Sequence, residues 1–176
     1  MNNNTGSNFY NYKTLVINNT FSNTGIFTNK KLNSANPDSI DLTGIEGTIT
    51  INSASESSGT FNNDGLLHLN QPLTLTGSTL NDENGTIRNY SILTNNSPGS
   101  ITNKHDIINY FVGTMNNNNI ITNSKVGNII GNLDNYGSFT NNETLTNNGT
   151  VLVRISGANV GVFTNNKTIT NNNSFI

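Results

Sequence analysis

The residues that could do chemistry are few in this sequence, and they lie far apart. Asp82 and Glu83 are the single adjacent acidic pair, just before an Asn-Gly turn, and His105 stands beside Asp106. Paired carboxylates could hydrolyse a glycosidic bond, and a His–Asp pair could act as a general base with its orienting group. Adjacent strand residues point to opposite faces, however, and the other carboxylates are dispersed. His68 and His105 show no metal-ligand spacing. We therefore predict no enzyme, no catalytic residue, no cofactor and no metal site.

Composition excludes several classes of partner. Of 176 residues, 10% are charged, eight of them are basic, and the net charge is −2, so no basic patch is available for phosphates. The opening MNNNTGSNFYNYKT has no basic start followed by an apolar segment, and no apolar run approaches the roughly 20 residues that span a bilayer. We expect no nucleic-acid partner, no membrane insertion and no readable signal peptide. Cysteine is absent, which leaves the redox compartment undetermined.

The elements that position these residues come from an internal repeat. Five segments align without a gap: GTFNNDGLLHLN, GTIRNYSILTNN, GTMNNNNIITNS, GSFTNNETLTNN and GVFTNNKTITNN. Their first glycines are Gly59, Gly85, Gly113, Gly137 and Gly161, separated by 26, 28, 24 and 24 residues, and a partial copy opens at Gly25. The sequence therefore predicts a repeat region over 25–176, with coil starts near 25, 59, 85, 113, 137 and 161. A strand-like segment, 1–24, precedes it.

Each column of this alignment has its own chemistry. Two columns are apolar and are the predicted core: Phe27, Phe61, Ile87, Met115, Phe139 and Phe163, then Leu67, Leu93, Ile121, Leu145 and Ile169. One column between them is asparagine throughout: Asn29, Asn63, Asn89, Asn117, Asn141 and Asn165. An amide can donate and accept at once, so stacked copies of this column predict an asparagine ladder. The glycines predict a bend or bulge.

Single apolar residues flanked by polar ones are typical of short strands with one face inward. One copy is too thin to bury a core, whereas stacked copies bury a continuous one. We predict an all-β parallel β-solenoid of about six coils of 24–28 residues. A left-handed helix of three six-residue sides would repeat at about 18 residues, so the longer spacing favours a right-handed β-helix over a left-handed one.

Segments such as TLTNNGTV (144–151) and TITNNNS (168–174) resemble the Asn/Thr/Gly-rich right-handed β-helices of filamentous haemagglutinin-like adhesins and autotransporter passenger domains. The resemblance covers roughly 25–176. It implies the β-helix architecture but no particular activity, because such repeats host unrelated functions on one fold.

The function that we predict is structural. No capping pattern precedes Gly25, and Ile176 is an apolar residue on an incomplete coil, so strand edges are expected at both ends. We predict head-to-tail self-association into a filament or surface fibre, at an extracellular or surface-associated location on a cell, spore or virion. The predicted assembly interface contains Phe9, Tyr10, Leu15, Ile17, Phe175 and Ile176.

Two alternatives stay open. The first is a carbohydrate- or receptor-binding module, adhesin-like or tailspike-like, that contacts surface glycans through tyrosines; Tyr10, Tyr12, Tyr90, Tyr110 and Tyr136 form no readable stripe in the sequence. The second is an ice-binding protein, which would need flat threonine arrays. Thr144 with Thr146 and Thr168 with Thr170 supply the pair in only two successive repeats.

Overall fold

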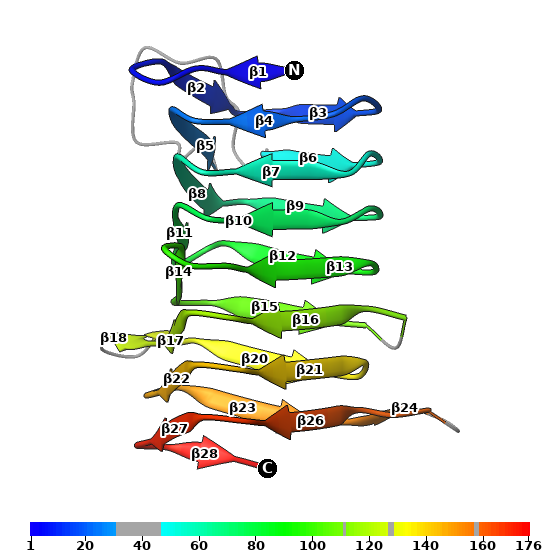
Figure 1. Cartoon of the computed structure of the whole chain (residues 1–176), viewed down its shortest axis with the longest axis vertical. Coiled ribbons are helices and arrows are strands. Elements are labelled where there is room, and N and C mark those ends of the chain that lie inside the picture. Colours follow the sequence, from blue (N-terminus) through cyan, green and yellow to red (C-terminus); the bar gives the residue numbers. More distant parts are fainter. Residues whose placement is uncertain (31–46, 111, 127–128, 157–158) are drawn as a thin grey trace.

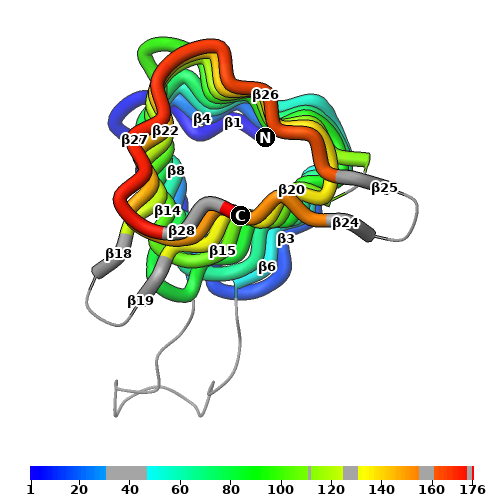
Figure 2. The backbone as a smooth tube through the Cα atoms, turned by 90° about the horizontal axis from the view of Figure 1, so that it is seen from below, coloured from blue at the N-terminus to red at the C-terminus, as the bar shows by residue number. Residues whose placement is uncertain are grey.

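The computed structural model describes residues 1–30, 47–110, 112–126, 129–156 and 159–176, and it leaves the side chains of 125–126, 129–130, 155–156, 159–160 and 174–175 undescribed. The chain forms a parallel β-solenoid, which confirms the predicted fold class. Its coils stack along one axis, with the two termini at opposite ends (Figure 1). Viewed along the axis, the coils superimpose and each turns through three sides (Figure 2). None of the described segments is a helix with the length and apolar character to cross a bilayer.

Each side of the solenoid is one eight-stranded sheet. Sheet A contains β1 (Asn2–Asn3), β4 (Ser22–Asn23), β7 (Ser55–Ser57), β10 (Leu73–Leu75), β13 (Ile92–Asn95), β16 (Thr114–Asn117), β21 (Ser138–Asn141) and β26 (Val162–Asn165). Sheet B contains β2 (Asn8–Asn11), β5 (Ile26–Lys30), β8 (Thr60–Asp64), β11 (Ser78–Asn81), β14 (Ser100–Asn103), β17 (Ile120–Asn123), β22 (Thr144–Asn147) and β27 (Thr168–Asn171). Sheet C contains β3 (Thr14–Ile17), β6 (Thr48–Ile51), β9 (Leu66–Leu69), β12 (Thr86–Asn89), β15 (Asp106–Asn109), β20 (Asn132–Asn135), β23 (Thr150–Val153) and β28 (Ser174–Phe175).

Two antiparallel hairpins interrupt the winding. The first joins sheets B and C and consists of β18 (Lys125–Val126) and β19 (Ile129–Ile130). The second joins sheets C and A and consists of β24 (Ile155–Ser156) and β25 (Asn159–Val160). Strands β18 and β24 extend away from the stacked coils (Figure 1), and the strands before and after the hairpins keep the parallel register of the sheets.

The strands follow the predicted period of two. In most four-residue strands the second and fourth residues are buried and the first and third are more exposed. The second position is mostly apolar and forms a continuous core in which Phe9, Phe27 and Phe61 stack at 5.0 and 5.2 Å between ring centroids. The fourth position is mostly asparagine. Short strands with one small inward surface therefore become stable only through their neighbours in the stack.

The glycines stand at corners where successive coils approach closely. A Cβ at Gly59 would overlap the carbonyl oxygen of Gly25, and a Cβ at Gly149 would overlap that of Gly131. Among the described residues only Gly6 has a positive φ, of 80°. Close backbone approach between coils, rather than a special backbone conformation, thus explains this column.

The sequence spacing between neighbouring coils is variable. Paired asparagines in adjacent coils are separated by 18, 20, 22, 24, 26 or 34 residues. The repeat glycines do not mark one side: Gly25 and Gly59 precede strands of sheet B, Gly85 precedes sheet C, and Gly113 precedes sheet A. The same six-residue motif builds all three sides, so an alignment can pass from one side to another without a gap. Segment 1–24 contributes the first strand of each sheet and the second strand of sheet A.

Candidate functional site

Asparagine ladders run through the interior of the solenoid, as the sequence predicts. The ladder in sheet B is unbroken, with Nδ2 of each member donating to Oδ1 of the next at 2.7–2.9 Å: Asn11, Asn29, Asn63, Asn81, Asn103, Asn123, Asn147 and Asn171. Sheet A has a ladder of Asn95, Asn117, Asn141 and Asn165, and sheet C has one of Asn89, Asn109 and Asn135. Side-chain amides therefore connect every coil to the next.

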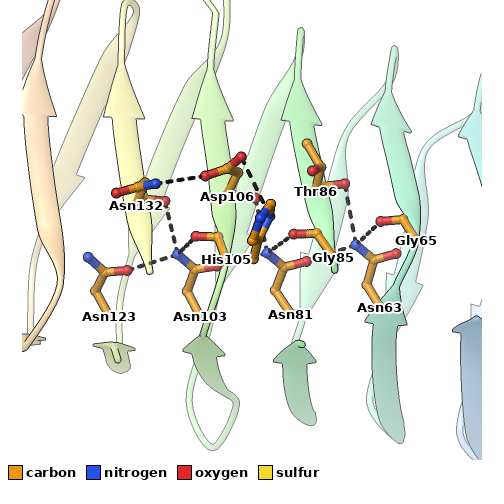
Figure 3. Close-up of polar contacts among 10 residues, drawn as sticks. All are labelled: Asn63, Gly65, Asn81, Gly85, Thr86, Asn103, His105, Asp106, Asn123 and Asn132. Atoms are coloured by element: carbon orange, nitrogen blue, oxygen red, sulfur yellow. Dashed lines mark hydrogen bonds and ion pairs between the residues drawn. The ribbon is translucent and has the colours of Figure 1, made fainter. Parts of the chain in front are cut away.

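Asn103 shows what one ladder member does (Figure 3). Its Nδ2 donates to the carbonyl of His105 at 2.9 Å, to Oδ1 of Asn123 at 2.8 Å and to the carbonyl of Asn132 at 2.9 Å. Its Oδ1 accepts from Nδ2 of Asn81 at 2.7 Å. The amide of Asn103 thus forms hydrogen bonds within its own coil, with the preceding coil and with the following coil. Because Asn103 is fully buried, each of these groups would cost free energy if left without a partner.

The six asparagines predicted as one column all lie in these ladders, but in three different ones, and this corrects the predicted column. Asn29 and Asn63 belong to sheet B, Asn89 to sheet C, and Asn117, Asn141 and Asn165 to sheet A. The sequence alignment moved from side to side because all sides share one motif. The unbroken ladder of sheet B was missed for this reason, although the fourth residue of every sheet B strand is asparagine.

The predicted apolar columns divide in the same way. Phe27, Phe61, Ile121, Leu145 and Ile169 lie in sheet B; Ile87 and Leu67 lie in sheet C; Leu93, Met115, Phe139 and Phe163 lie in sheet A. All of them point inward. Nine are buried, and Phe163 and Ile169, in the last coil, are partly buried against the same core.

The inner ladders have a direction, because the Nδ2 donor of each asparagine points toward the C-terminal end of the solenoid. Outer ladders at the corners run the opposite way: Asn118 donates to Asn96, Asn142 to Asn118 and Asn166 to Asn142, at 2.7–2.8 Å. The two ends of the solenoid therefore differ chemically. At the N-terminal end the inner asparagines offer Oδ1 acceptors, and at the C-terminal end they offer Nδ2 donors.

The predicted interface residues lie in the first and last coils. Phe9 and Leu15 are inward residues that are only partly buried, whereas Ile17 is 4% exposed. Tyr10 points outward and is 49% exposed, and Ile176 is 74% exposed. Phe175 pairs with Val151 through its backbone, and its side chain lies outside the described part of the chain. The residues thus form two surfaces at opposite ends of the molecule rather than one patch (Figure 1).

The tyrosines form a stripe that the sequence did not reveal. Tyr90, Tyr110 and Tyr136 follow successive strands of sheet C and stack with centroid distances of 4.2 and 6.3 Å. Burial and a hydrogen bond to Tyr110 raise the pKa of Tyr90. Arg154 lies 5.9 Å from the ring of Tyr136 and extends the stripe. The three half-buried rings thus form one row along the corner that follows sheet C.

The outward face of sheet B is rich in hydroxyl groups. Four successive strands carry a threonine at the third position: Thr102, Thr122, Thr146 and Thr170. The first position carries Ser100, Ile120, Thr144 and Thr168. These four strands present no charged side chain outward. The threonine array is therefore longer than the sequence alignment indicated, since that alignment placed these strands beside strands of other sheets.

The residues first considered for catalysis make structural contacts. Asp82 accepts from Nζ of Lys104 at 3.0 Å. His105 Nδ1 lies 3.5 Å from Oδ2 of Asp106, which is an ion-pair distance without hydrogen-bond geometry, and Oδ1 of Asp106 accepts from Asn132. The two side chains thus approach each other, contrary to the expectation of opposite faces, because His105 occupies a corner rather than a strand (Figure 3). Within the described ranges, no three His, Asp or Glu side chains gather as a metal site would require.

Comparisons with protein-family models, with curated proteins and with solved structures found no match for this chain.

Proposed function

We propose that the protein is a structural component that associates head to tail through its terminal coils and forms a filament. The observation that carries the proposal is the state of the core at the two ends. Phe9 and Leu15 in the first coil, and Phe163 and Ile169 in the last, belong to the same core columns as fully buried residues but remain partly exposed. Stacking of a further coil would complete their burial, as it does for every interior coil.

The surface chemistry supports a structural role. Threonine, serine and asparagine dominate the outward positions of sheets A and B. The ion pairs are separate from one another: Arg154–Asp134 on sheet C, Lys104–Asp82 at the corner between sheets B and C, and Lys167–Glu143 at the corner between sheets A and B. Among the described residues, no group of three His, Asp or Glu side chains converges on this surface. We extend the proposal to display at the surface of a cell, spore or virion, where the resemblance to filamentous haemagglutinin-like adhesins would place such a fibre.

The test is electron microscopy of untagged protein over a concentration series, together with sedimentation. Unbranched filaments whose mass fraction rises with concentration are expected. The matched variants are Phe9→Asp, which charges the exposed core of the first coil, and Thr102→Asp, which adds the same charge on the outward side of an interior strand of the same sheet. Filaments should disappear with Phe9→Asp and persist with Thr102→Asp. Uniform short rods at all concentrations would refute the proposal.

One observation favours ice binding as a second candidate, namely the four-strand threonine array on sheet B. In a parallel sheet, its members repeat at about 4.8 Å along the solenoid and at about 6.6 Å along each strand. An ordered array of hydroxyl and methyl groups is the kind of surface that ice recognition requires. Thermal hysteresis that is lost in Thr122→Lys and retained in Thr140→Lys, on sheet A, would support this candidate, and absence of hysteresis in the unaltered protein would remove it.

A further inference from the structure

The two ends of the solenoid match each other position by position, and we propose that they join in one polarity and one register: strands β26, β27 and β28 of one copy pair with β1, β2 and β3 of the next. This inference rests on the proposed self-association and specifies its junction. The partner is a second copy of this chain, because the complementary surface is its own first coil.

The polarity follows from the inner ladders. In the last coil, Nδ2 of Asn171 donates to the carbonyl of Asn173 in its own turn, and its Oδ1 already accepts from Asn147. Interior members such as Asn123 use Nδ2 both for their own corner and for the following coil. A following coil would therefore complete Asn171 by offering an acceptor. Asn165 in sheet A is in the same situation, since it donates to the carbonyl of Lys167 and accepts from Asn141.

The first coil offers those acceptors. Asn11 donates to Asn29, and its Oδ1 has a single long contact, 3.4 Å from the amide nitrogen of Lys13. A carbonyl oxygen can accept two hydrogen bonds, and Oδ1 of Asn147 does so, from Asn123 and from the amide of Gly149. Asn3 in sheet A likewise donates to Asn23. Two N-terminal ends would set acceptor against acceptor, and two C-terminal ends donor against donor, so only head-to-tail contact continues the ladders.

The register follows from aligning the ladders. When Asn171 meets Asn11, Ile169 covers Phe9 and Thr170 lies beside Tyr10 on the outside. In sheet A, Asn165 then meets Asn3. In sheet C, the backbone position of Phe175 meets that of Leu15. The junction thus repeats the pattern of the interior, with apolar residues on apolar residues and asparagine on asparagine. A shift by one residue would turn every inward side chain outward.

The outer ladder, which runs in the opposite direction, can also continue across this head-to-tail junction. Asn166 donates to Asn142, so its Oδ1 is the group that faces a following coil. Asn4 of the next copy follows Asn3 as Asn166 follows Asn165, and it would supply the donor. One head-to-tail junction therefore extends ladders of both directions.

Disulfide trapping tests polarity and register together, since the chain has no cysteine of its own. Tyr10→Cys and Thr170→Cys replace exposed outward residues that the proposed junction sets side by side. Paired strands place their Cα atoms about 4.8 Å apart, within the range that a disulfide spans. Thr168→Cys is the matched control, because it lies two residues along the same strand, about 8 Å from position 10, beyond disulfide reach.

The two single variants are mixed under mild oxidation, and the cross-linked species are identified by peptide mapping. We expect Tyr10→Cys with Thr170→Cys to give the mixed dimer in large excess over either homodimer, and Tyr10→Cys with Thr168→Cys to give about tenfold less. Filaments that cross-link mainly between two copies of Tyr10→Cys, or through Thr168→Cys, would overturn the proposed junction while leaving self-assembly intact. Absence of both filaments and cross-links would overturn the proposed function and this inference with it.

A second variant tests the amide donor directly. Asn171→Asp replaces the Nδ2 donor by a carboxylate, which would face the Oδ1 acceptor of Asn11. Asn172→Asp places the same charge one residue further on, where the side chain lies in an outer ladder. We expect Asn171→Asp to raise the concentration needed for filament growth about tenfold above that of Asn172→Asp. Equal values for the two variants would contradict the role of the ladder in the junction.

Discussion

The fourth residue of each strand points inward, and its type differs between sheets B and C. In sheet B it is asparagine in all eight coils, joined by side-chain hydrogen bonds from Asn11 to Asn171. In sheet C it is apolar in the first three coils, then asparagine in three, then valine: Ile17, Ile51, Leu69, Asn89, Asn109, Asn135 and Val153. Both sheets keep one parallel register. Apolar packing and amide ladders are thus alternative ways to fill one position.

The difference lies in what a single substitution disturbs. An apolar residue loses contacts in proportion to the surface that it buries. A ladder asparagine instead satisfies groups in its own coil and in two neighbours, and removing it leaves buried partners without hydrogen bonds. The ladder should therefore be more sensitive to substitution in its middle than at its boundary with the apolar segment.

The largest effect is expected for Asn103→Leu, in the middle of the sheet B ladder. The substitution removes a donor to three oxygens and an acceptor for Asn81. With about 1–3 kcal/mol for each buried group left without a partner, we expect a loss of about 4 kcal/mol in the free energy of unfolding. Chemical denaturation measures this value.

Thr102→Val is the control for this variant, because residue 102 is on the same strand and faces outward. It should change the free energy of unfolding by less than about 0.5 kcal/mol. If Asn103→Leu changed the free energy of unfolding as little as Thr102→Val, the ladder would not contribute to the stability of the fold.

Asn89→Leu tests the boundary in sheet C and should have a smaller effect. Asn89 donates to Asn109 at 2.7 Å and to the carbonyl of Thr114 at 2.9 Å, but the preceding coil has Leu69 at this position. A leucine would lose bonds on one side and gain apolar contact on the other. We expect about 2 kcal/mol of destabilisation, roughly half the effect at Asn103. Equal losses at the two positions would show that the apolar neighbour gives no compensation.

The sequence predicted the class of fold because the features that cause this fold lie within each six-residue unit. Alternation of apolar and polar residues, asparagine at strand ends and glycine at corners are readable in each six-residue unit. The sequence did not assign units to sides, since Phe61, Ile87 and Met115 have equivalent surroundings in three different sheets. The tyrosine stripe was hidden for the same reason. Tyr90, Tyr110 and Tyr136 are separated by coils of unequal length, so they become neighbours only once the sheet C register is known.

The smallest expected effect concerns the outward side of the boundary between Leu69 and Asn89. His68 pairs in register with Arg88 on strands β9 and β12. Burial first, and the charge of Arg88 second, hold the pKa of His68 below 6.5. Neutral His68 therefore contributes stability at pH values above 6.5, and this contribution is lost as the pH falls through the lowered pKa.

Arg88→Gln removes the second cause and leaves the burial, so the pKa of His68 should rise toward 6.5 without reaching it. An NMR titration of the His68 ring measures the change, and Arg154→Gln, which removes the same charge near Asp134, is the control. An unchanged His68 pKa in Arg88→Gln would mean that solvent screens this contact and that burial alone sets the shift. Because His68 and Arg88 point outward while Leu69 and Asn89 point inward, the titration would also show that the two faces of this strand pair can be altered independently.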